Sequence, residues 1–322
     1  MIKYSHMRIK RIFLTKSIIA TLIITIVIFS GCDLFDNIKV EKVKSTDIIN
    51  NSELYKQPKQ KEQNTFYFGF DPRNSPQKDV AQYIPLMNYL EEHTGFKFKL
   101  HFTPKNSSTV EELGKNYTQF ALMGAMGFLK SQILFNTKVI VRGINKDTQS
   151  KYRSFFVTKA NSTINKMQGH KLAFGNINST QGNLIPRIEL KKNDIDIETL
   201  KGFGYTGSHQ KCAEAVISGS YDICAMQDQL AQKLSNDGLL KIIYKSSWYP
   251  SSGIVVNGLV PREVIDKVKK ALISFEPQGK DKGMLLNWEN TEMPLGFTNV
   301  KANDYDNLKF WALKLGLLPT KE

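Results

Sequence analysis

Four short turns rich in Ser, Thr, Asn and Gly hold the residues of this sequence that are best suited to bind a ligand. They span 175–182, 205–209, 104–109 and, more weakly, 124–127, each between an expected strand and an expected helix. The start of a helix exposes unpaired backbone N–H groups and the positive end of the helix dipole, and hydroxyl side chains add donors. Because Ser, Thr and Asn are also common N-cap residues, one such turn alone has an ordinary structural explanation. Several turns that converge predict a site for an oxyanion that needs no metal ion.

Strands and helices alternate after residue 64 and must position these turns. The apolar patterns predict strands at 66–70, 97–102, 120–124, 138–142, 154–158, 171–175, 203–205, 222–226, 240–244 and 254–257. They predict helices at 107–115, 182–192, 208–218, 261–275 and 305–315, and an earlier helix that ends at Gly95 and begins near Ile84 because Pro85 interrupts it. This alternation is typical of an α/β fold with mostly parallel sheets, in which helix starts lie at the carboxyl ends of the strands.

The composition is that of an ordinary globular protein. Of the 322 residues, 41% are hydrophobic and 23% are charged, which excludes collagen, a coiled coil and wholesale disorder. The length suits one large domain or two lobes, each with its own core. Three cysteines are too few for a disulfide scaffold, and we expect Cys212 and Cys224 to be free thiols against apolar neighbours. A disulfide between these two cysteines is the alternative.

Residues 1–31 have the pattern of a lipoprotein signal peptide. Five cations and no acid accompany an apolar run at 17–29, which is shorter than the roughly 20 residues of a membrane-spanning helix. Ser30 and Gly31 are small and precede Cys32, the expected site of lipidation. An uncleaved signal anchor, with Cys32 incidental, is the alternative. Residues 32–64 are polar and aperiodic, which predicts a flexible tether; a helix at 47–55 packed on the body is the alternative.

Whether it is cleaved or not, the signal sequence at 1–31 places the rest of the chain outside the cytoplasm. This argues against a role in cytosolic metabolism or in nucleic-acid binding, although the net charge of +14 alone would suit a nucleic-acid-binding protein. The five histidines have no metal-ligand spacing, and the sequence contains neither a G-x-S-x-G elbow nor a P-loop. We therefore expect no metal, no cofactor and no catalytic residue.

Several segments resemble one family of transport proteins. In chain order they are 69–76, 83–90, 152–154, 172–186 and 205–209, and the most specific are Asn-Ser-Thr-x-Gly at 178–182 and Gly-Ser-His at 207–209. From residue 66 to about 318, the chain resembles the solute-binding proteins of phosphonate, phosphite and phosphate ABC importers. The resemblance implies a type II periplasmic-binding fold, with two α/β lobes, two crossovers and a cleft that closes by hinge motion. We place the crossovers near 157–160 and 253–256, so that 65–157 and 256–322 form lobe one and 158–255 form lobe two.

The resemblance also implies the roles of individual residues. Ser179 and Thr180 would bind oxyanion oxygens through their hydroxyl and backbone N–H groups. His209, with Ser208 before it, would donate a ring N–H to the same group. Tyr152 would reach the ligand from near the hinge.

Four departures from the family pattern concern the rest of the site. Gln181 stands where a third hydroxyl residue is usual, and Asn106 stands where binders of aminophosphonates have a tyrosine. Of the two carboxylates that hold the ligand ammonium in those binders, one aligns with Asp228 or Gln229, and Ser252 replaces the other. We therefore expect an intact oxyanion site that prefers a ligand without an amine.

The sequence as a whole predicts a monomeric, lipid-anchored protein that captures a phosphorus oxyanion (phosphonate, phosphite or phosphate) and delivers it to an inner-membrane ABC permease. Its expected location is the outer face of the cytoplasmic membrane or the periplasm. A lipoprotein of the same fold that serves as a sensor or surface antigen for another solute is the alternative. An enzyme on this fold is a distant third, because the sequence supplies no nucleophile and no paired carboxylates.

Overall fold

The computed structural model describes residues 64–71, 75–104 and 106–319. All of these residues lie within one unit of the chain, Asn51–Glu322. The expected signal peptide, Cys32 and the tether up to residue 63 lie outside the described residues. Within the described part, no helix has the length and apolar character needed to cross a lipid bilayer.

The first lobe is built on a six-stranded sheet. In spatial order its strands are β13 (Phe297–Asn299), β4 (Lys138–Gly143), β12 (Gly253–Val256), β3 (Phe120–Met123), β1 (Thr65–Phe70) and β2 (Lys97–His101). Strand β1 runs parallel to β2 and β3, whereas β12 is antiparallel to β3 and β4, and β13 is antiparallel to β4. The carboxyl ends of β1, β2 and β3 therefore meet at one edge of the sheet.

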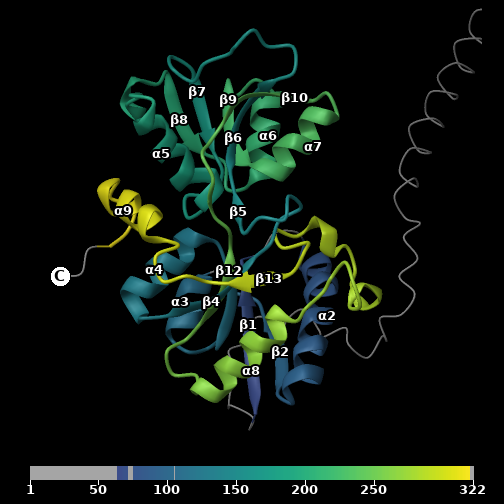
Figure 1. Ribbon diagram of the computed structural model, residues 1–322. Helices are drawn as coiled ribbons and strands as arrows, with labels where there is room; N and C mark the ends of the chain where they lie inside the picture. Colours follow the sequence, from purple (N-terminus) through teal and green to yellow (C-terminus); the bar gives the residue numbers. More distant parts are fainter. Residues whose placement is uncertain (1–63, 72–74, 105, 320–322) are drawn as a thin grey trace, which may run out of the picture. The chain divides into compact units, whose positions relative to one another are not determined.

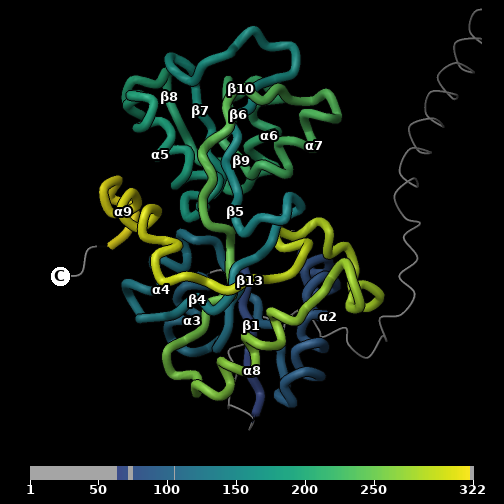
Figure 2. The backbone as a smooth tube through the Cα atoms, in the orientation of Figure 1, coloured from purple at the N-terminus to yellow at the C-terminus, as the bar shows by residue number. Residues whose placement is uncertain are grey.

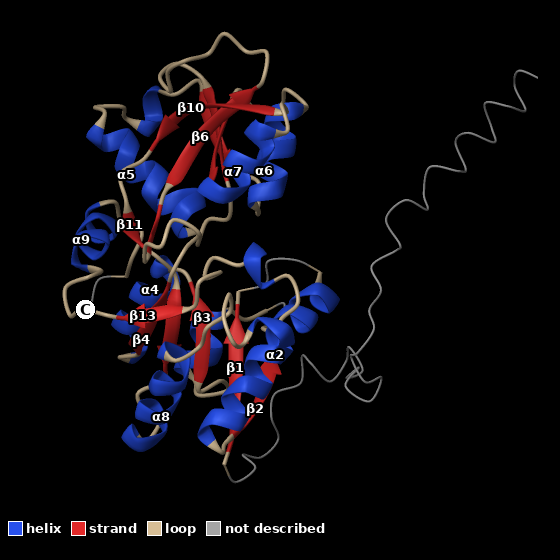
Figure 3. Cartoon of the chain, turned by 45° about the vertical axis from the view of Figure 1, so that its right-hand side comes forward, coloured by secondary structure: helices blue, strands red, loops and turns tan. Residues whose placement is uncertain are grey.

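Helices cover both faces of this sheet (Figure 3). On one face, α2 (Pro76–Thr94) and α8 (Arg262–Ile273) pack on the aromatic core formed around Phe68, Phe120 and Trp288. On the other face, α3 (Thr109–Gly114), α4 (Ala125–Phe135) and α9 (Asp306–Lys314) cover a second apolar cluster. Two short helices, η4 (Lys282–Met284) and η5 (Trp288–Asn290), lie between α8 and β13.

The second lobe has a five-stranded sheet of its own. Its spatial order is β10 (Leu240–Lys245), β6 (Ser154–Lys159), β9 (Ile223–Gln227), β7 (Lys171–Phe174) and β8 (Gly202–Tyr205). Strand β7 is parallel to β8 and β9, and β6 is antiparallel to β9 and β10. Around this sheet lie η2 (Thr180–Leu184), α5 (Ile185–Lys192), η3 (Ile197–Thr199), α6 (His209–Ile217) and α7 (Asp228–Asn236). Both sheets are mixed and not mostly parallel, because β6 and β12, which arrive from the other lobe, and β13 run opposite to the remaining strands of their sheets.

The two lobes are joined by a pair of short antiparallel strands, β5 (Lys151–Tyr152) and β11 (Tyr249–Pro250), which Figure 2 shows as the chain passing twice between the sheets. The crossovers expected near 157–160 and 253–256 fall instead within β6, in the second sheet, and β12, in the first. Apolar patterns show where a strand lies but not to which sheet it pairs, so the boundaries were misplaced by a few residues.

Helix α2 continues through Pro85, so the expectation of a start near Ile84 is wrong. Proline removes one N–H from the helix, and the buried side chains of Tyr83, Leu86 and Leu90 hold the helix on the core on both sides of it. Gly95 ends α2 as expected, with a φ of 74° and its N–H bonded to the Glu91 carbonyl at 3.0 Å.

Cys212 and Cys224 form a disulfide, so the expectation of free thiols is wrong. Cys212 lies on α6 and Cys224 on β9, and their Cα atoms are 5.6 Å apart. Both side chains are fully buried in the core that α6 shares with β9. Their separation of twelve residues gave no indication that the two positions face each other across that core.

Candidate functional site

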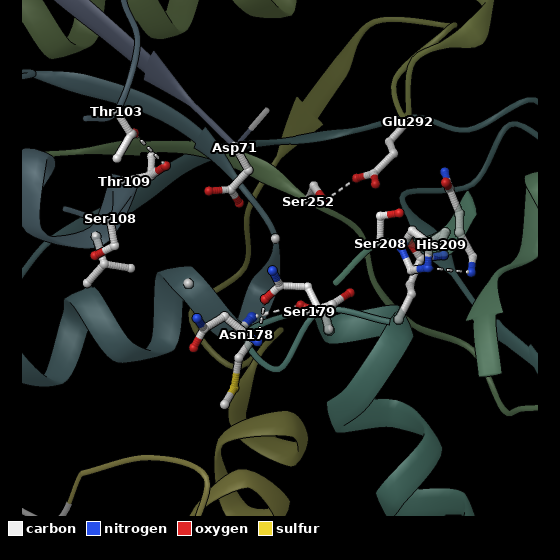
Figure 4. A pocket seen from close by; sticks show the side chains of 18 of the residues that line it. Asp71, Thr103, Ser108, Thr109, Asn178, Ser179, Ser208, His209, Ser252 and Glu292 are labelled. Atoms are coloured by element: carbon white, nitrogen blue, oxygen red, sulfur yellow. Dashed lines mark hydrogen bonds between the residues drawn. The ribbon is translucent and has the colours of Figure 1, made fainter. Parts of the chain in front are cut away.

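A cavity of about 490 Å³ lies where the carboxyl ends of parallel strands from both sheets approach one another. Its walls include the residues that follow β1, β2 and β3 in the first lobe and those at the ends of β7, β8 and β9 in the second; these are Asp71, Thr103, Gly124, Asn176, Gly207 and Gln227. Figure 4 shows polar side chains that surround it. The volume is in the range of small-molecule sites, and strand ends are where α/β folds bind ligands.

The turn after β7 closes on itself and presents Ser179 to the cavity. The Ser179 hydroxyl accepts a hydrogen bond from the Gly182 N–H at 2.9 Å, and the Gly175 N–H donates to the Gly182 carbonyl at 2.9 Å. Ser179 is thus the N-cap of η2, with its hydroxyl proton left to donate. This conformation places a hydroxyl and helix-start N–H groups at the cavity wall, as expected for an oxyanion site.

Gly182 brings His209 against the same turn. A Cβ atom on Gly182 would lie 3.0 Å from His209 Cε1 and 3.1 Å from Ser179 Oγ, so a larger residue here would press on both side chains. His209 begins α6, which is capped by Ser208, and its Nδ1 accepts a hydrogen bond from the Gln227 N–H at 3.3 Å. In the neutral ring the proton then resides on Nε2, which makes that nitrogen a donor.

Thr180 and Tyr152 meet at the start of α4, in the first lobe. The Thr180 hydroxyl accepts from the Met126 N–H at 2.9 Å, and the Tyr152 hydroxyl accepts from the Ala125 N–H at 3.5 Å. Both side chains are about 5% exposed and both line the cavity. The weakest of the four expected turns, at 124–127, thus receives hydroxyl groups from the second lobe and the joining strand.

Gln181 lines the cavity, but its side-chain amide forms hydrogen bonds with other residues of the cavity wall. Its Nε2 donates to the Arg153 carbonyl at 2.8 Å and to Asp228 Oδ1 at 3.2 Å. Asp228 also accepts from the backbone N–H groups of Arg153 and Gln229, and it is not among the lining residues. Burial raises the pKa of Asp228, although the two backbone N–H groups oppose the shift.

Of the eight ligand-binding residues expected from the sequence, six line the cavity and two do not. The six are Ser179, Thr180, Gln181, Ser208, His209 and Tyr152. Asp228 is turned into the wall by its three hydrogen bonds, and Asn106 is exposed outside the lining while its neighbours Ser107 and Ser108 are part of it. Position in the sequence could not distinguish these orientations, because adjacent residues of a turn point in different directions.

Two carboxylates in the cavity wall were missed. Asp71 follows β1 directly, so the rule that ligands bind at strand ends could have found it. Glu292 lies between η5 and β13, in a segment without periodicity, and its carboxylate accepts a hydrogen bond from the Ser252 hydroxyl. Among the described residues, no group of three or more His, Cys, Asp or Glu side chains could hold a metal ion.

The arrangement defines a class of protein: two α/β lobes with a polar ligand cleft at their strand ends. Residues 68–305 match the family model described as "ABC transporter, phosphonate, periplasmic substrate-binding protein", and the chain belongs to this family. This confirms the resemblance found in the sequence. The protein is accordingly a solute-binding protein of an ABC importer, which acts outside the cytoplasm, and not an enzyme.

Individual relatives agree with this assignment. The chain is 25% identical over 303 residues to the probable ABC transporter phosphite binding protein PhnD1 of Prochlorococcus marinus, covering 88% of this chain and 92% of the relative. It is 25% identical over 236 residues to the phosphonates-binding periplasmic protein of Escherichia coli, covering 69% and 70%.

Solved structures confirm the type II fold. PhnD1 of Prochlorococcus marinus in complex with methylphosphonate superimposes with a TM-score of 0.69 at 18% identity, over 79% of this chain and 99% of that one. The periplasmic aliphatic sulphonate binding protein SsuA of Escherichia coli superimposes with a TM-score of 0.57 at 12% identity, over 81% and 90%.

Proposed function

We propose that this protein captures a phosphorus oxyanion (phosphonate, phosphite or phosphate) in the cleft and delivers it to an ABC permease while anchored to the membrane through Cys32. The observation that best supports this proposal is the packing of Ser179 and His209 around Gly182, where a Cβ atom would come within about 3 Å of both side chains. Two side-chain donors from separate helix starts are thereby held at one wall of the cavity. Relatives described as binding phosphite and phosphonates support this choice of ligand.

The chemistry of this wall suits a tetrahedral oxyanion. Hydroxyl, imidazole N–H and backbone N–H groups at helix starts all donate hydrogen bonds, and the helix dipoles add a positive potential. Closure of the lobes, which type II proteins undergo about the strands that join them, would complete the ligand's shell of donors. The Thr180–Met126 hydrogen bond is one contact between the two lobes that is present in this structure.

The function is tested by titrating methylphosphonate into the full chain in mild detergent, together with a His209→Ala variant. Loss of a hydrogen bond between His209 and a charged ligand should weaken binding by roughly tenfold to a hundredfold. His170→Ala is the matched control, because His170 is also in the second lobe but does not line the cavity. Equal affinity in the His209 variant would place this residue outside the site, and no binding of methylphosphonate, phosphite or phosphate would favour the sensor or antigen alternative.

The anchor is a separate part of the proposal and rests on the sequence at 1–32. Stable attachment needs two or more acyl chains, since a single one binds membranes only marginally. Mass spectrometry of the mature N-terminus should find a diacylated or triacylated Cys32. An unmodified Cys32, or retention of residues 1–31, would disprove anchoring and leave the ligand assignment intact.

A further inference from the structure

We propose that Glu189, a buried carboxylate outside the ligand cleft, is a positioning residue of the hinge: it holds the β11 crossover to the second lobe and thereby sets how readily the cleft closes. The inference rests on the function proposed above, because it concerns the closure by which the ligand is captured. It assigns no contact between Glu189 and the ligand, since Glu189 is not among the residues that line the cavity.

Glu189 lies on α5, is 1% exposed and binds two tyrosines. The Tyr249 hydroxyl donates to its Oε1 at 2.6 Å, and the Tyr244 hydroxyl donates to its Oε2 at 2.7 Å. The Lys192 ammonium lies 3.5 Å from Oε1 and donates to the Tyr249 hydroxyl at 2.9 Å. Burial and the hydrogen bond to Glu189 raise the pKa of Tyr249, so its hydroxyl remains protonated and donates. Because a buried carboxylate is costly without such partners, this cluster resists separation.

The two tyrosines belong to different parts of the molecule. Tyr244 lies on β10, at the edge of the second sheet, whereas Tyr249 lies on β11, the strand of the crossover (Figure 3). The bond from Tyr244 to Glu189 is therefore internal to the second lobe. The bond from Tyr249 attaches the crossover to that lobe.

The first lobe binds the same crossover two residues later. The Ser251 hydroxyl donates to the Gly143 carbonyl at 2.7 Å, and the Ser251 carbonyl accepts from the Tyr305 hydroxyl at 2.8 Å. Gly143 ends β4 and Tyr305 precedes α9, so both partners belong to the first lobe. One residue, Pro250, separates the position held by Glu189 from the position held by the first lobe. The pivot of this crossover is thereby confined to Pro250.

The other crossover is divided at the same level. The Asn145 side chain, in the turn after β4, donates to the Lys151 carbonyl at 2.7 Å, and the Arg153 N–H donates to Asp228 of α7 at 3.0 Å. Tyr152 lies between these two held positions, pairs with β11 and lines the cavity. The two pivots are therefore neighbours in one pair of strands, and they define an axis on which a residue of the cavity wall lies.

One helical run connects Glu189 with the oxyanion turn. Ser179 caps η2, which continues directly into α5, so roughly 15 Å of helix separates Ser179 from Glu189. A rigid run of this kind transmits the position of the turn to the crossover. Without the carboxylate, β11 would gain freedom in the ligand-free protein that closure must remove again, and this loss of entropy would weaken ligand binding.

The test compares Tyr249→Phe with Tyr244→Phe, two variants that each remove one hydroxyl from the same carboxylate. Calorimetric titration of the full chain in mild detergent should show methylphosphonate binding weakened by roughly five- to thirtyfold in Tyr249→Phe and in Glu189→Gln. Tyr244→Phe is the matched control: it loses the same kind of hydrogen bond within the second lobe, and its affinity should stay that of the unmodified chain. Phosphite and phosphate should weaken by the same factor as methylphosphonate, because Glu189 acts on closure and touches no ligand.

Distances between the lobes supply a measurement that a purely structural role would not change. Spin labels at Leu134→Cys, on α4, and Leu239→Cys, just before β10, report this distance by double electron–electron resonance, since both side chains are 47% exposed. The ligand-free distribution should be broader in Tyr249→Phe and Glu189→Gln than in Tyr244→Phe and the unmodified chain.

Equal losses of affinity in Tyr249→Phe and Tyr244→Phe, or unmodified affinity in Tyr249→Phe, would overturn the inference. A ligand-free distance distribution that neither Tyr249→Phe nor Glu189→Gln broadens would overturn it as well. Melting temperatures establish that every variant is folded. If the unmodified chain binds none of methylphosphonate, phosphite and phosphate, the proposed function fails, and the ligand-free distributions still decide whether Glu189 holds the hinge.

Discussion

The two walls of the cleft are made in different ways. The wall from the second lobe consists mainly of two turns, 175–182 and 206–209. Ser179 and Ser208 each cap the helix that follows by accepting a hydrogen bond from an N–H group three positions on, whereas Thr180 and His209 also bond to distant residues. The wall from the first lobe collects Asp71, Gln82, residues 103–104 and 107–110, the start of α4, Ser252 and Glu292 from distant parts of the chain. One wall is thus local in sequence and the other is assembled only by tertiary contacts.

The two walls also differ in the chemical groups that they present to the cavity. The local wall carries hydroxyl, imidazole and helix-start N–H groups and no carboxylate among its lining residues, which suits a tetrahedral oxyanion. The assembled wall holds both carboxylates among the lining residues, those of Asp71 and Glu292.

The strongest way to break the local wall is Gly182→Val. Its Cβ would lie about 3 Å from both His209 and Ser179, so both side chains must move. Overpacking of this kind costs about 1–3 kcal/mol, and here the cost falls on the groups that bind the ligand, so affinity should drop by roughly a hundredfold. Titration with methylphosphonate measures it. Gly283→Ala, where an added Cβ meets no atom within 4 Å, is the control; wild-type affinity in Gly182→Val would contradict the role of this turn.

The disulfide behind the local wall offers the next test. A double variant, Cys212→Ala with Cys224→Ala, removes a cross-link that closes a short loop, and the free energy of unfolding should fall by about 2–3 kcal/mol. Urea unfolding measures this. A reductant should reproduce the loss in the unmodified chain and have no effect on the variant. Ligand affinity should change little, because both cysteines are buried behind the wall; an unchanged urea midpoint would contradict the prediction.

The contact between the two walls is tested by Thr180→Val. Valine cannot accept a hydrogen bond, so the buried N–H of Met126 loses its partner at a cost of about 1–2 kcal/mol, and affinity should fall by roughly five- to thirtyfold. Thr180→Ser keeps the hydroxyl and is the matched control. If the two variants bind methylphosphonate equally well, the contact contributes nothing to the closed cleft.

The smallest expected effect concerns Asp228, which accepts a hydrogen bond from the Gln181 side chain in the cavity wall. Because burial raises the pKa of Asp228 above its ordinary 3.8, the folded protein holds this proton more tightly than the unfolded chain does. The stability that this provides is complete below pH 3.8 and is lost as the pH rises through the folded-state pKa. Asp228→Asn should flatten that part of the stability–pH curve, which thermal unfolding across pH values of about 4 to 7 can measure. An unaltered slope would show that Asp228 titrates alike in both states.

Much of the fold could be predicted from local patterns. Ten of the strands lie where alternating apolar residues predicted them, within one or two residues at their ends, and Gly95 ends α2 as expected. Helix α4 was missed because it is apolar all round, and strands β5, β11 and β13 because they have only two or three residues. Helix α7 was missed although its sequence is amphipathic. The extent of α2 was misjudged because the burial that holds Pro85 inside a helix is not visible in a local window.

The sequence by itself determined the oxyanion turns of this protein. Asn-Ser-Thr-x-Gly and Gly-Ser-His each form one turn at one helix start, so nearby residues dictate where the Ser179 and Ser208 hydroxyls point. The His209 ring and the Thr180 hydroxyl, in contrast, also bond to the distant Gln227 and Met126. Only the tertiary structure decided that β12 returns to the first sheet, that Cys212 meets Cys224, that Asp228 turns into the wall, and that Glu292 reaches Ser252. The physical reason is the range of the interactions: hydrogen bonds within a turn are set by a few backbone dihedral angles, whereas contacts between remote segments depend on how the whole core packs.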